Sequence, residues 1–323
     1  MKAIRLHEIA GPKNLVIDEV ERPQPQPGEA LVHVRAAALN HRDVFITQGL
    51  YPKITLPCVL GADGAGEMDG EPVLIDPTIG WGSDERVWDL SSSILGVPLP
   101  GTFAEYVCVP RENVHVKPPH LSFEEAAALP LAGVTAYRAA FVRGELKAGE
   151  TVLITGIGGG VQTYALLYAK AAGARVIVTS SSDEKLERAK ALGADLTVNY
   201  KTDAEWHKTA RKAAGVIDMA IDSAGGETFA KAASIVRPGG RIVTYGGTSG
   251  DTKMRMFPVF WNQLDIRGTS MGSPADFRDM LDFITKHEIR PVIDRVFEMN
   301  EAIAAAERMQ QADQFGKIVL RIA

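Results

Sequence analysis

Two different rhythms of apolar and polar positions divide this chain of 323 residues. Up to about residue 120, short apolar runs alternate with polar positions and are separated by Pro and Gly, a pattern typical of half-buried strands. Asp69-Gly70 predicts a tight hairpin turn. We therefore expect an antiparallel, barrel-like domain here. Its predicted strands are 15–20, 30–39, 71–76 and 102–109.

From about residue 150 the pattern changes to apolar strands that alternate with helical segments. Regular alternation at this spacing predicts a parallel sheet covered on both faces by helices, a doubly wound α/β domain. Ser122 and Glu125 form a capping box that predicts a helix over 124–129 between the two halves. The predicted strands are 151–155, 175–179, 196–199, 216–221, 241–245, 265–270, 291–299 and 317–322; the predicted helices are 183–192, 204–214, 275–287 and 300–311.

The first of these parallel strands runs into four glycines, Gly156, Gly158, Gly159 and Gly160, and a helical segment follows. Glycines let the backbone approach a pyrophosphate, and the start of the helix presents free N–H groups to it. The order of strand, glycine turn and helix predicts a dinucleotide site. The third glycine of the G-x-G-x-x-G pattern is missing in every register, which affects the packing of helix on strand.

The end of the second parallel strand favours NADP(H) over NAD. An NAD site places an Asp or Glu there for the ribose 2′-hydroxyl, whereas this chain has three serines, 180–182. Hydroxyl groups and the nearby Lys185 would bind a 2′-phosphate, which a carboxylate would repel. The alternative is that Asp183 or Glu184 binds the ribose and Lys185 is solvated.

Composition excludes several other classes. The net charge of −5 gives no field that would attract nucleic acid, and the basic residues in 207–212 fit a solvated helix face. The two cysteines, Cys58 and Cys108, cannot form a four-thiolate zinc site. The first residues, MKAIRLHE, lack an apolar signal core, and no apolar run is long enough to span a bilayer. We expect a cytoplasmic protein without nucleic-acid or membrane partners.

Four segments together resemble the medium-chain dehydrogenase/reductase superfamily along the whole chain. They are 101–110 (GTFAEYVCVP), 126–139, 146–161 and 316–322 (GKIVLRI). The resemblance implies a GroES-like, antiparallel β-barrel-like catalytic domain from residues 1–123 and 268–323. It also implies a Rossmann NADP-binding domain from residues 124–267.

The resemblance further implies a zinc-free, quinone-oxidoreductase-like member with no metal. Asn40 stands where the zinc enzymes have a Cys ligand, and Ala62 stands where they have a His ligand. The segment 78–101, which would hold their structural zinc, contains no cysteine. Phe45 replaces a tyrosine that often serves as a proton donor, for which Tyr51 is a possible substitute. The long segment 77–101 is equally consistent with a substrate lid and with a structural remnant.

The expected reaction is hydride transfer from NADPH to a quinone, enal, enone or related carbonyl. Without zinc, the charge that develops on the substrate oxygen needs hydrogen-bond donors, for which Asn40 and Thr135 are the candidates, with Asp43 beside them in the pocket segment and water as the proton source. The resemblance assigns to the cofactor Gly158, Gly159, Gly160, Val161, Ser180, Ser181, Lys185, Tyr200, Gly246, Thr248, Ser270, Met271, Gly272 and Lys317.

Two other functions remain open at this level. One is a zinc-free alcohol dehydrogenase or carbonyl reductase, and the other is an idle NADPH-binding protein with a regulatory role. A homodimer is expected, because the apolar segment 255–270 could pair as an edge strand across a two-fold axis.

Overall fold

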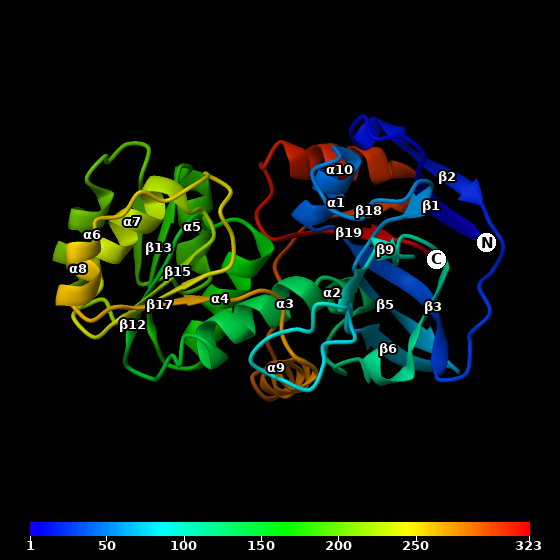
Figure 1. The fold of residues 1–323 in the computed structure, drawn as a ribbon, viewed down its shortest axis with the longest axis horizontal. Helices are drawn as coiled ribbons and strands as arrows, with labels where there is room; N and C mark the ends of the chain where they lie inside the picture. Colours follow the sequence, from blue (N-terminus) through cyan, green and yellow to red (C-terminus); the bar gives the residue numbers. More distant parts are fainter. The chain divides into compact units, whose positions relative to one another are not determined.

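The computed structural model describes residues 1–323, which form two compact units. The first unit comprises residues 1–134 and 272–323, and the second comprises residues 135–271 (Figure 1). The borders differ from the expected ones at 123 and 267. Helix α2 (Phe123–Ala127) packs on strands of the first unit, which explains why the first unit extends to Val134.

The first unit is built on a mostly antiparallel seven-stranded sheet, as the alternating pattern predicted. Its order is β11-β6-β5-β3-β19-β18, and β10 pairs with part of β3. Only β18 and β19 run parallel within it. The strands are β3 (Glu29–Ala38), β5 (Asp63–Met68), β6 (Glu71–Ile75), β10 (Tyr106–Pro110), β11 (Val114–Val116), β18 (Ile293–Glu298) and β19 (Lys317–Arg321).

Two smaller sheets and several helices complete this unit. One sheet has the order β2-β1-β4, and the other has the order β7-β8-β9. These strands are β1 (Lys2–Leu6), β2 (Leu15–Glu19), β4 (Cys58–Val59), β7 (Thr78–Ile79), β8 (Ser93–Leu95) and β9 (Pro98–Leu99). The helices besides α2 are η1 (Pro12–Asn14), α1 (His41–Thr47), η2 (Arg111–Asn113), α3 (Pro130–Tyr137, which continues into the second unit), α9 (Pro274–Lys286), η4 (Met299–Glu301) and α10 (Ala302–Gln310).

Two local predictions for this unit are confirmed and one strand is shorter than predicted. Asp69 and Gly70 both adopt positive φ, 53° and 87°, and turn β5 into β6. Ser122 and Glu125 form the capping box that opens α2. Strand β10 begins only at Tyr106, because Phe103 and Ala104 belong to a separate connection along β1.

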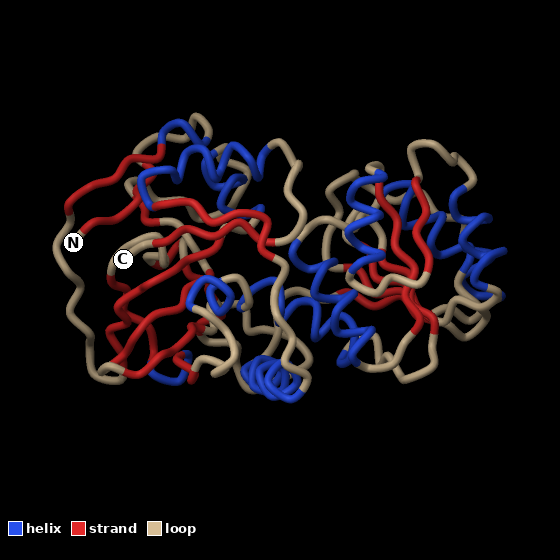
Figure 2. The backbone as a smooth tube through the Cα atoms, turned by 180° about the vertical axis from the view of Figure 1, so that it is seen from behind, coloured by secondary structure: helices blue, strands red, loops and turns tan.

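The second unit is a six-stranded parallel sheet with the order β14-β13-β12-β15-β16-β17, flanked by helices on both faces (Figure 2). This is the doubly wound arrangement that the alternation predicted. Its strands are β12 (Thr151–Ile154), β13 (Arg175–Ser180), β14 (Leu196–Asn199), β15 (Met219–Asp222), β16 (Arg241–Thr244) and β17 (Asp265–Gly268). Its helices are η3 (Arg138–Val142), α4 (Gly160–Ala171), α5 (Asp183–Ala191), α6 (Trp206–Ala214), α7 (Gly226–Ile235) and α8 (Met256–Trp261).

The prediction of a strand over 255–270 is wrong for its first half. Residues Met256–Trp261 form the short helix α8, and only Asp265–Gly268 pair with the sheet. The apolar run MFPVFW favours a strand, but it forms a helix in which no residue is buried. Pro258 and Val259 are half-buried, and the other side chains of α8 are exposed. Apolarity here therefore reflects a surface feature rather than a position in the core.

Candidate functional site

The glycine loop after β12 has the geometry of a pyrophosphate cradle. Gly156 and Gly158 adopt φ of 67° and 139°, in the region that residues with side chains rarely occupy. A Cβ at Gly159 would overlap the side-chain amide of Gln162. Helix α4 begins at Gly160 with Gly159 as its N-cap, and no side chain caps its first N–H groups. These groups are available to an anion.

Gln162, one of the residues that stand at the third-glycine position in the different registers, joins α4 to the segment after β15. Its side chain turns toward the next strand of the sheet, where Nε2 donates a hydrogen bond of 2.8 Å to Ser223 Oγ. The side chain therefore links the first turn of α4 to the residue that follows β15. Val161, also predicted at the cofactor, lies between Gly160 and Gln162 in the first turn of α4.

The serines predicted to select the cofactor lie together at the end of β13. Ser180 ends the strand and its Oγ accepts the N–H of Ser182 at 3.2 Å. Ser182 caps α5 by accepting the N–H of Lys185. The carboxylate of Asp183 instead accepts a hydrogen bond of 2.7 Å from the side-chain amide of Asn199.

The neighbouring predicted residues complete this end of the sheet. The backbone N–H of Tyr200 donates to the carbonyl of Ser180 at 3.0 Å, and the Tyr200 side chain is 41% exposed. Ser181 is exposed at the tip between β13 and α5. The structure therefore brings Ser180, Ser181, Lys185 and Tyr200 into one group at the carboxyl end of β13.

Two further loops at the same edge of the sheet are joined by hydrogen bonds. Asp222 ends β15, is fully buried, and accepts hydrogen bonds from Thr155 Oγ1 at 2.6 Å and from the Gly225 N–H at 2.8 Å. Burial raises the pKa of Asp222. The backbone N–H of Thr248 donates to the carbonyl of Ser223 at 3.3 Å. The predicted Gly246 and Thr248 thus belong to a loop that is fastened beside the glycine cradle, where ligands of doubly wound sheets bind.

The segment 270–272, also predicted at the cofactor, follows β17 at the border of the two units. Ser270 is exposed, whereas Met271 is 4% exposed and has a φ of 56°. A Cβ at Gly272 would overlap the side chain of Val134. Gly272 is therefore required for close packing within the first unit.

The first unit contains a second polar cluster, formed by Asn40, Asp63 and Lys317. Asn40 is the N-cap of α1, Asp63 opens β5, and Lys317 opens β19. Lys317 Nζ donates to Asn40 Oδ1 at 2.7 Å and to Asp63 Oδ2 at 2.8 Å. Asn40 Nδ2 also donates to Asp63 Oδ2 at 2.9 Å, and the backbone N–H of Leu131 donates to Asp63 Oδ1 at 2.8 Å. All three side chains are buried, so an ion pair and an amide form one satisfied group.

Lys317, one of the residues predicted at the cofactor, has its ammonium held by Asn40 and Asp63 and is 2% exposed. Sequence reasoning missed Asp63, because no local pattern marks the acidic residue of Gly61-Ala62-Asp63-Gly64 as the buried partner of a lysine 254 residues away.

Asp43 lies beside this cluster. Its Oδ2 accepts the backbone N–H of Asn40 at 2.8 Å, which completes a capping box at the start of α1. Its other oxygen, Oδ1, is buried and has no hydrogen-bond partner. Burial raises the pKa of Asp43 to about 6. Burial, together with the charge of Lys317, lowers the pKa of the adjacent His41.

The residues present do not fit a zinc ion. Ala62 has no donor atom, the Asn40 amide is engaged at both ends, and the Lys317 ammonium would repel a cation. No group of three or more His, Cys, Asp or Glu side chains in residues 1–323 is placed to hold a metal. Cys58 and Cys108 are both free thiols on different strands.

The remaining candidates are placed as follows. Thr135 lies on α3, is 5% exposed, and is the first residue of the second unit. Phe45 lies on α1 and is 37% exposed. The Tyr51 hydroxyl accepts a hydrogen bond of 3.3 Å from Arg42 Nε, whose guanidinium lies 4.7 Å from the ring centre.

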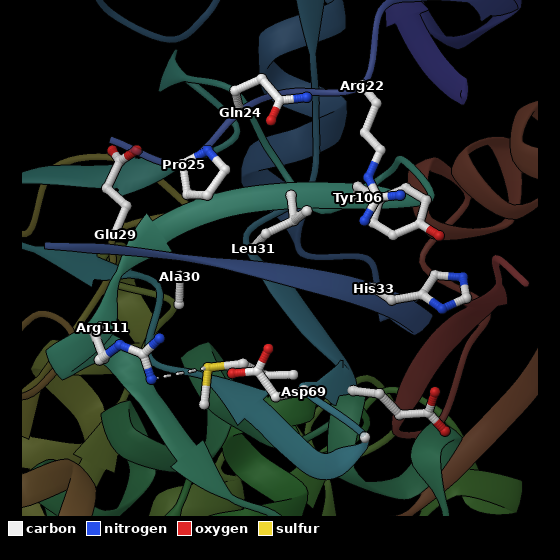
Figure 3. Close-up of a pocket in the computed structure, with 13 residues that line it drawn as sticks. Arg22, Gln24, Pro25, Glu29, Ala30, Leu31, His33, Asp69, Tyr106 and Arg111 are labelled. Atoms are coloured by element: carbon white, nitrogen blue, oxygen red, sulfur yellow. Dashed lines mark hydrogen bonds between the residues drawn. The ribbon is translucent and has the colours of Figure 1, made fainter. Parts of the chain in front are cut away.

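A separate open groove of about 520 Å³ lies on the first unit and includes none of the predicted site residues. Figure 3 shows Arg22 stacked on Tyr106 at one end and Arg111 at the other, with Leu31 on the floor between them. Tyr106 in turn stacks on His33 with ring centres 4.6 Å apart. This stack fastens the Pro-rich connection 20–28 to the sheet.

Comparison with known proteins identifies the family. Residues 26–119 match the model of the alcohol dehydrogenase GroES-like domain, and residues 160–286 match that of the zinc-binding dehydrogenases. A zinc-type alcohol dehydrogenase-like protein of Leptosphaeria maculans is 39% identical over 95% of this chain and 94% of its own length. The chain belongs to the medium-chain dehydrogenase/reductase superfamily. The resemblance drawn from the four sequence segments is thereby confirmed.

Solved structures of this superfamily match both units. The crystal structure of an NAD-dependent alcohol dehydrogenase superposes with a TM-score of 0.93 at 36% identity and covers all of both chains. The quinone oxidoreductase of Coxiella burnetii gives a TM-score of 0.80 at 27% identity and covers 100% of this chain and 99% of its own. This medium-chain dehydrogenase/reductase is an oxidoreductase, and its fold is one that binds a nicotinamide dinucleotide. None of its helices is long and apolar enough to cross a membrane.

Proposed function

We propose that this protein is an NADPH-dependent reductase of quinones, enals, enones or related carbonyl compounds that works without a metal. The observation that carries the proposal is the buried group of Asn40, Asp63 and Lys317, in which an ion pair fixes the Asn40 amide and leaves no set of metal ligands. Bound NADPH would supply the hydride.

Asn40 is the residue that would bind the substrate oxygen. Lys317 donates to the amide oxygen of Asn40, and Asp63 accepts one hydrogen of its amide nitrogen, so the amide is held in a single orientation. The second hydrogen on Nδ2 remains as a donor for the oxygen on which negative charge develops. The hydroxyl of Thr135 is the second proposed donor, and water would deliver the proton.

The group at the end of β13 supports NADP(H) as the cofactor. Three serines occupy the position at which an NAD site carries an acidic residue, and Lys185 lies in the first turn of α5. Asp183, the nearest carboxylate, is directed to Asn199. Hydroxyl groups, an ammonium and the N-terminus of a helix together favour the extra phosphate.

The test is cofactor oxidation by the purified, chelator-treated protein. NADPH and NADH are compared with a quinone and with an enal as acceptors, and Asn40→Ala is compared with wild type. The proposal expects turnover with NADPH that chelation does not change, and a loss of about 100-fold in kcat in Asn40→Ala with little change in KM. Equal use of NADH would refute the cofactor assignment, and loss of activity after chelation would refute the metal-free mechanism.

Alcohol oxidation with NAD is the second candidate, because the matching structure with 36% identity is named an NAD-dependent alcohol dehydrogenase. A screen of primary and secondary alcohols with NAD and with NADP separates the two. Turnover of an alcohol with NAD, without reduction of any quinone or enal, would favour this second function. Binding of NADPH without turnover of any acceptor would instead favour an idle regulatory protein.

We further propose that a second copy of the chain covers the exposed edge of the second unit. Strand β17 is the last strand of its sheet, and next to it α8 exposes Phe257, Phe260 and Trp261 by 53%, 64% and 69%. An open strand edge beside an aromatic patch of this kind is typical of a self-associating surface. Sedimentation of the double variant Phe260→Ser/Trp261→Ser as a monomer, against a wild-type dimer, would support this surface. A wild-type monomer would refute it.

A further inference from the structure

A small pocket of about 200 Å³ lies on the first unit. One wall is the turn Tyr51–Lys53, which follows α1. The other wall is made by the segment 88–98, including Trp88, Leu90 and Val97. All of these residues belong to the first unit.

The segment 77–101 (light blue to cyan in Figure 1) is a folded element rather than a loose remnant. Strands β7, β8 and β9 form a sheet within it. Trp81 is 3% exposed and donates from Nε1 to the carbonyl of Asp84 at 3.0 Å. The N–H of Asp89 donates to the carbonyl of Trp81 at 2.7 Å. These bonds hold the tip 84–92 in place, so the pocket wall is preformed.

Arg42 joins this element to the proposed substrate-binding amide. It is the second residue of α1, two positions after Asn40. Its guanidinium donates to the carbonyls of Leu95 at 2.5 Å and Val97 at 3.2 Å and stacks on Tyr51. Both Tyr51 and Val97 line the pocket. One side chain therefore ties both walls of the pocket to the helix that Asn40 caps.

A second contact places the element beside Asp63. A Cβ at Gly96 would lie only 3.0 Å from the backbone N and O of Gly61, so the two backbones are in direct contact. Gly61 precedes Asp63 by two residues. The segment thus contacts α1 through Arg42 and the residues before Asp63 through Gly61, which are two of the three chain segments that form the polar cluster.

The tip exposes apolar side chains. Leu90 is 97% exposed and Trp88 is 37% exposed, and both line the pocket. Apolar surface left in water on a fastened segment favours a ligand that covers it. A cavity of about 150 Å³ is enough to bind benzene, so this pocket has room for one ring or a chain of several carbons.

We infer that this pocket binds the apolar chain of the substrate, so that the preferred acceptors are carbonyl compounds with a linear alkyl chain or an aryl group rather than small polar ones. The inference rests on the proposed function, because it concerns the same substrate. Leu90 and Trp88 are the residues that determine specificity, and the Asn40 amide receives the carbonyl end.

The test separates binding from turnover. Binding of straight-chain primary alkanamides of four to ten carbons, which cannot be reduced by the enzyme, is measured by calorimetry, and kcat/KM is measured with 2-alkenals of the same lengths. Each added methylene should tighten binding about fourfold until the pocket is filled. The gain in binding per added methylene should be smaller in Leu90→Ser and in Trp88→Ala. Val87→Ser is the matched control, because Val87 is 56% exposed on the same tip but does not line the pocket.

The possible outcomes test the pocket assignment and the proposed reaction separately. Amide binding without dependence on length, or the same smaller gain per methylene in the Val87→Ser control, would overturn the pocket assignment. A change in oligomeric state in Leu90→Ser would overturn it too, because the tip would then cover a second copy. Length-dependent amide binding without reduction of any alkenal would keep the pocket and refute the proposed reaction. Alkenal reduction without dependence on length would support the proposed reaction and refute the pocket assignment.

Discussion

Removal of the Lys317 ammonium tests whether the buried cluster is a stabilising unit. The Lys317–Asp63 pair has an N–O distance of 2.8 Å, and its side chains are 3% and 0% exposed. In Lys317→Met, Asp63 would keep the hydrogen bonds from Asn40 Nδ2 and the Leu131 N–H but would lose its only counter-charge. Breaking one side of a buried ion pair costs about 3–5 kcal/mol, because the remaining charge stays desolvated.

The chain offers a matched control in a solvent-accessible pair of the same chemistry. Lys170 and Asp195 are also 2.8 Å apart, but their side chains are 32% and 34% exposed. Lys170→Met should therefore cost only about 0–1 kcal/mol. The difference between the free-energy costs of the two substitutions measures the effect of burial, since the ion types and the distance are the same.

The assay is hydrogen exchange of the β3, β5 and β19 amides for Lys317→Met and of the β13 and β14 amides for Lys170→Met. Local exchange is preferred to a single melting temperature because the two units can unfold separately. The double variant Lys317→Met/Asp63→Asn should regain most of the lost free energy, because no buried charge is left unpaired. A cost below about 1 kcal/mol for Lys317→Met, or no recovery in the double variant, would refute the reasoning.

Three further predictions concern the cofactor and pH. Ser181→Asp should weaken NADPH binding at least about tenfold and improve NADH relative to NADPH, measured by fluorescence titration, because a carboxylate repels the 2′-phosphate; unchanged NADPH affinity would contradict the site. Gly156→Ala should weaken both dinucleotides, since its φ of 67° is one that residues with a Cβ rarely adopt, whereas Gly268→Ala, with open space around it and no positive φ, should not; equal effects would contradict the cradle. Asp76 is 1% exposed and burial raises its pKa from 3.8 to about 7, so the folded state holds a proton that the unfolded state has released between these values. The free energy of unfolding that protonated Asp76 contributes at low pH is therefore lost as pH rises from about 4 to 7. In Asp76→Asn, the free energy of unfolding from urea titrations should fall less over this pH range than in the wild type. The same pH dependence in both proteins would contradict the pKa shift.

The fold could be predicted from the sequence because its signals are local. Alternation with a period of two in residues 30–39 and the Asp69-Gly70 turn each depend on neighbouring residues only. The glycine loop 156–160 is also a local signal, because Gly156 and Gly158 adopt positive φ values that favour glycine. Such signals do not depend on the rest of the chain, which is why the predicted strands 30–39 and 71–76 agree with β3 and β6 to within one residue.

The polar cluster could not be predicted in the same way, because its members are far apart in sequence. Lys317 binds Asn40 and Asp63 only after β19 has been placed beside β3, and a lysine before an apolar strand resembles any solvated lysine. Similarly, the aromatic residues of α8 match the pattern of a buried strand, although they are exposed. Long-range pairing and surface apolarity are the two features that periodicity does not encode.

The insertion of the second unit within the first also sets the order in which the protein can fold during synthesis. Strand β19 pairs with β3, so the sheet of the first unit stays incomplete until the last residues are translated. Asp63 and Lys317 are separated by 254 residues, which take about 13–50 s to translate at about 5–20 residues per second. Residues 135–271 are complete earlier and can fold by themselves as the chain emerges. The half-built first unit, with Asp63 still lacking its cation, is then the species that nascent-chain chaperones would meet.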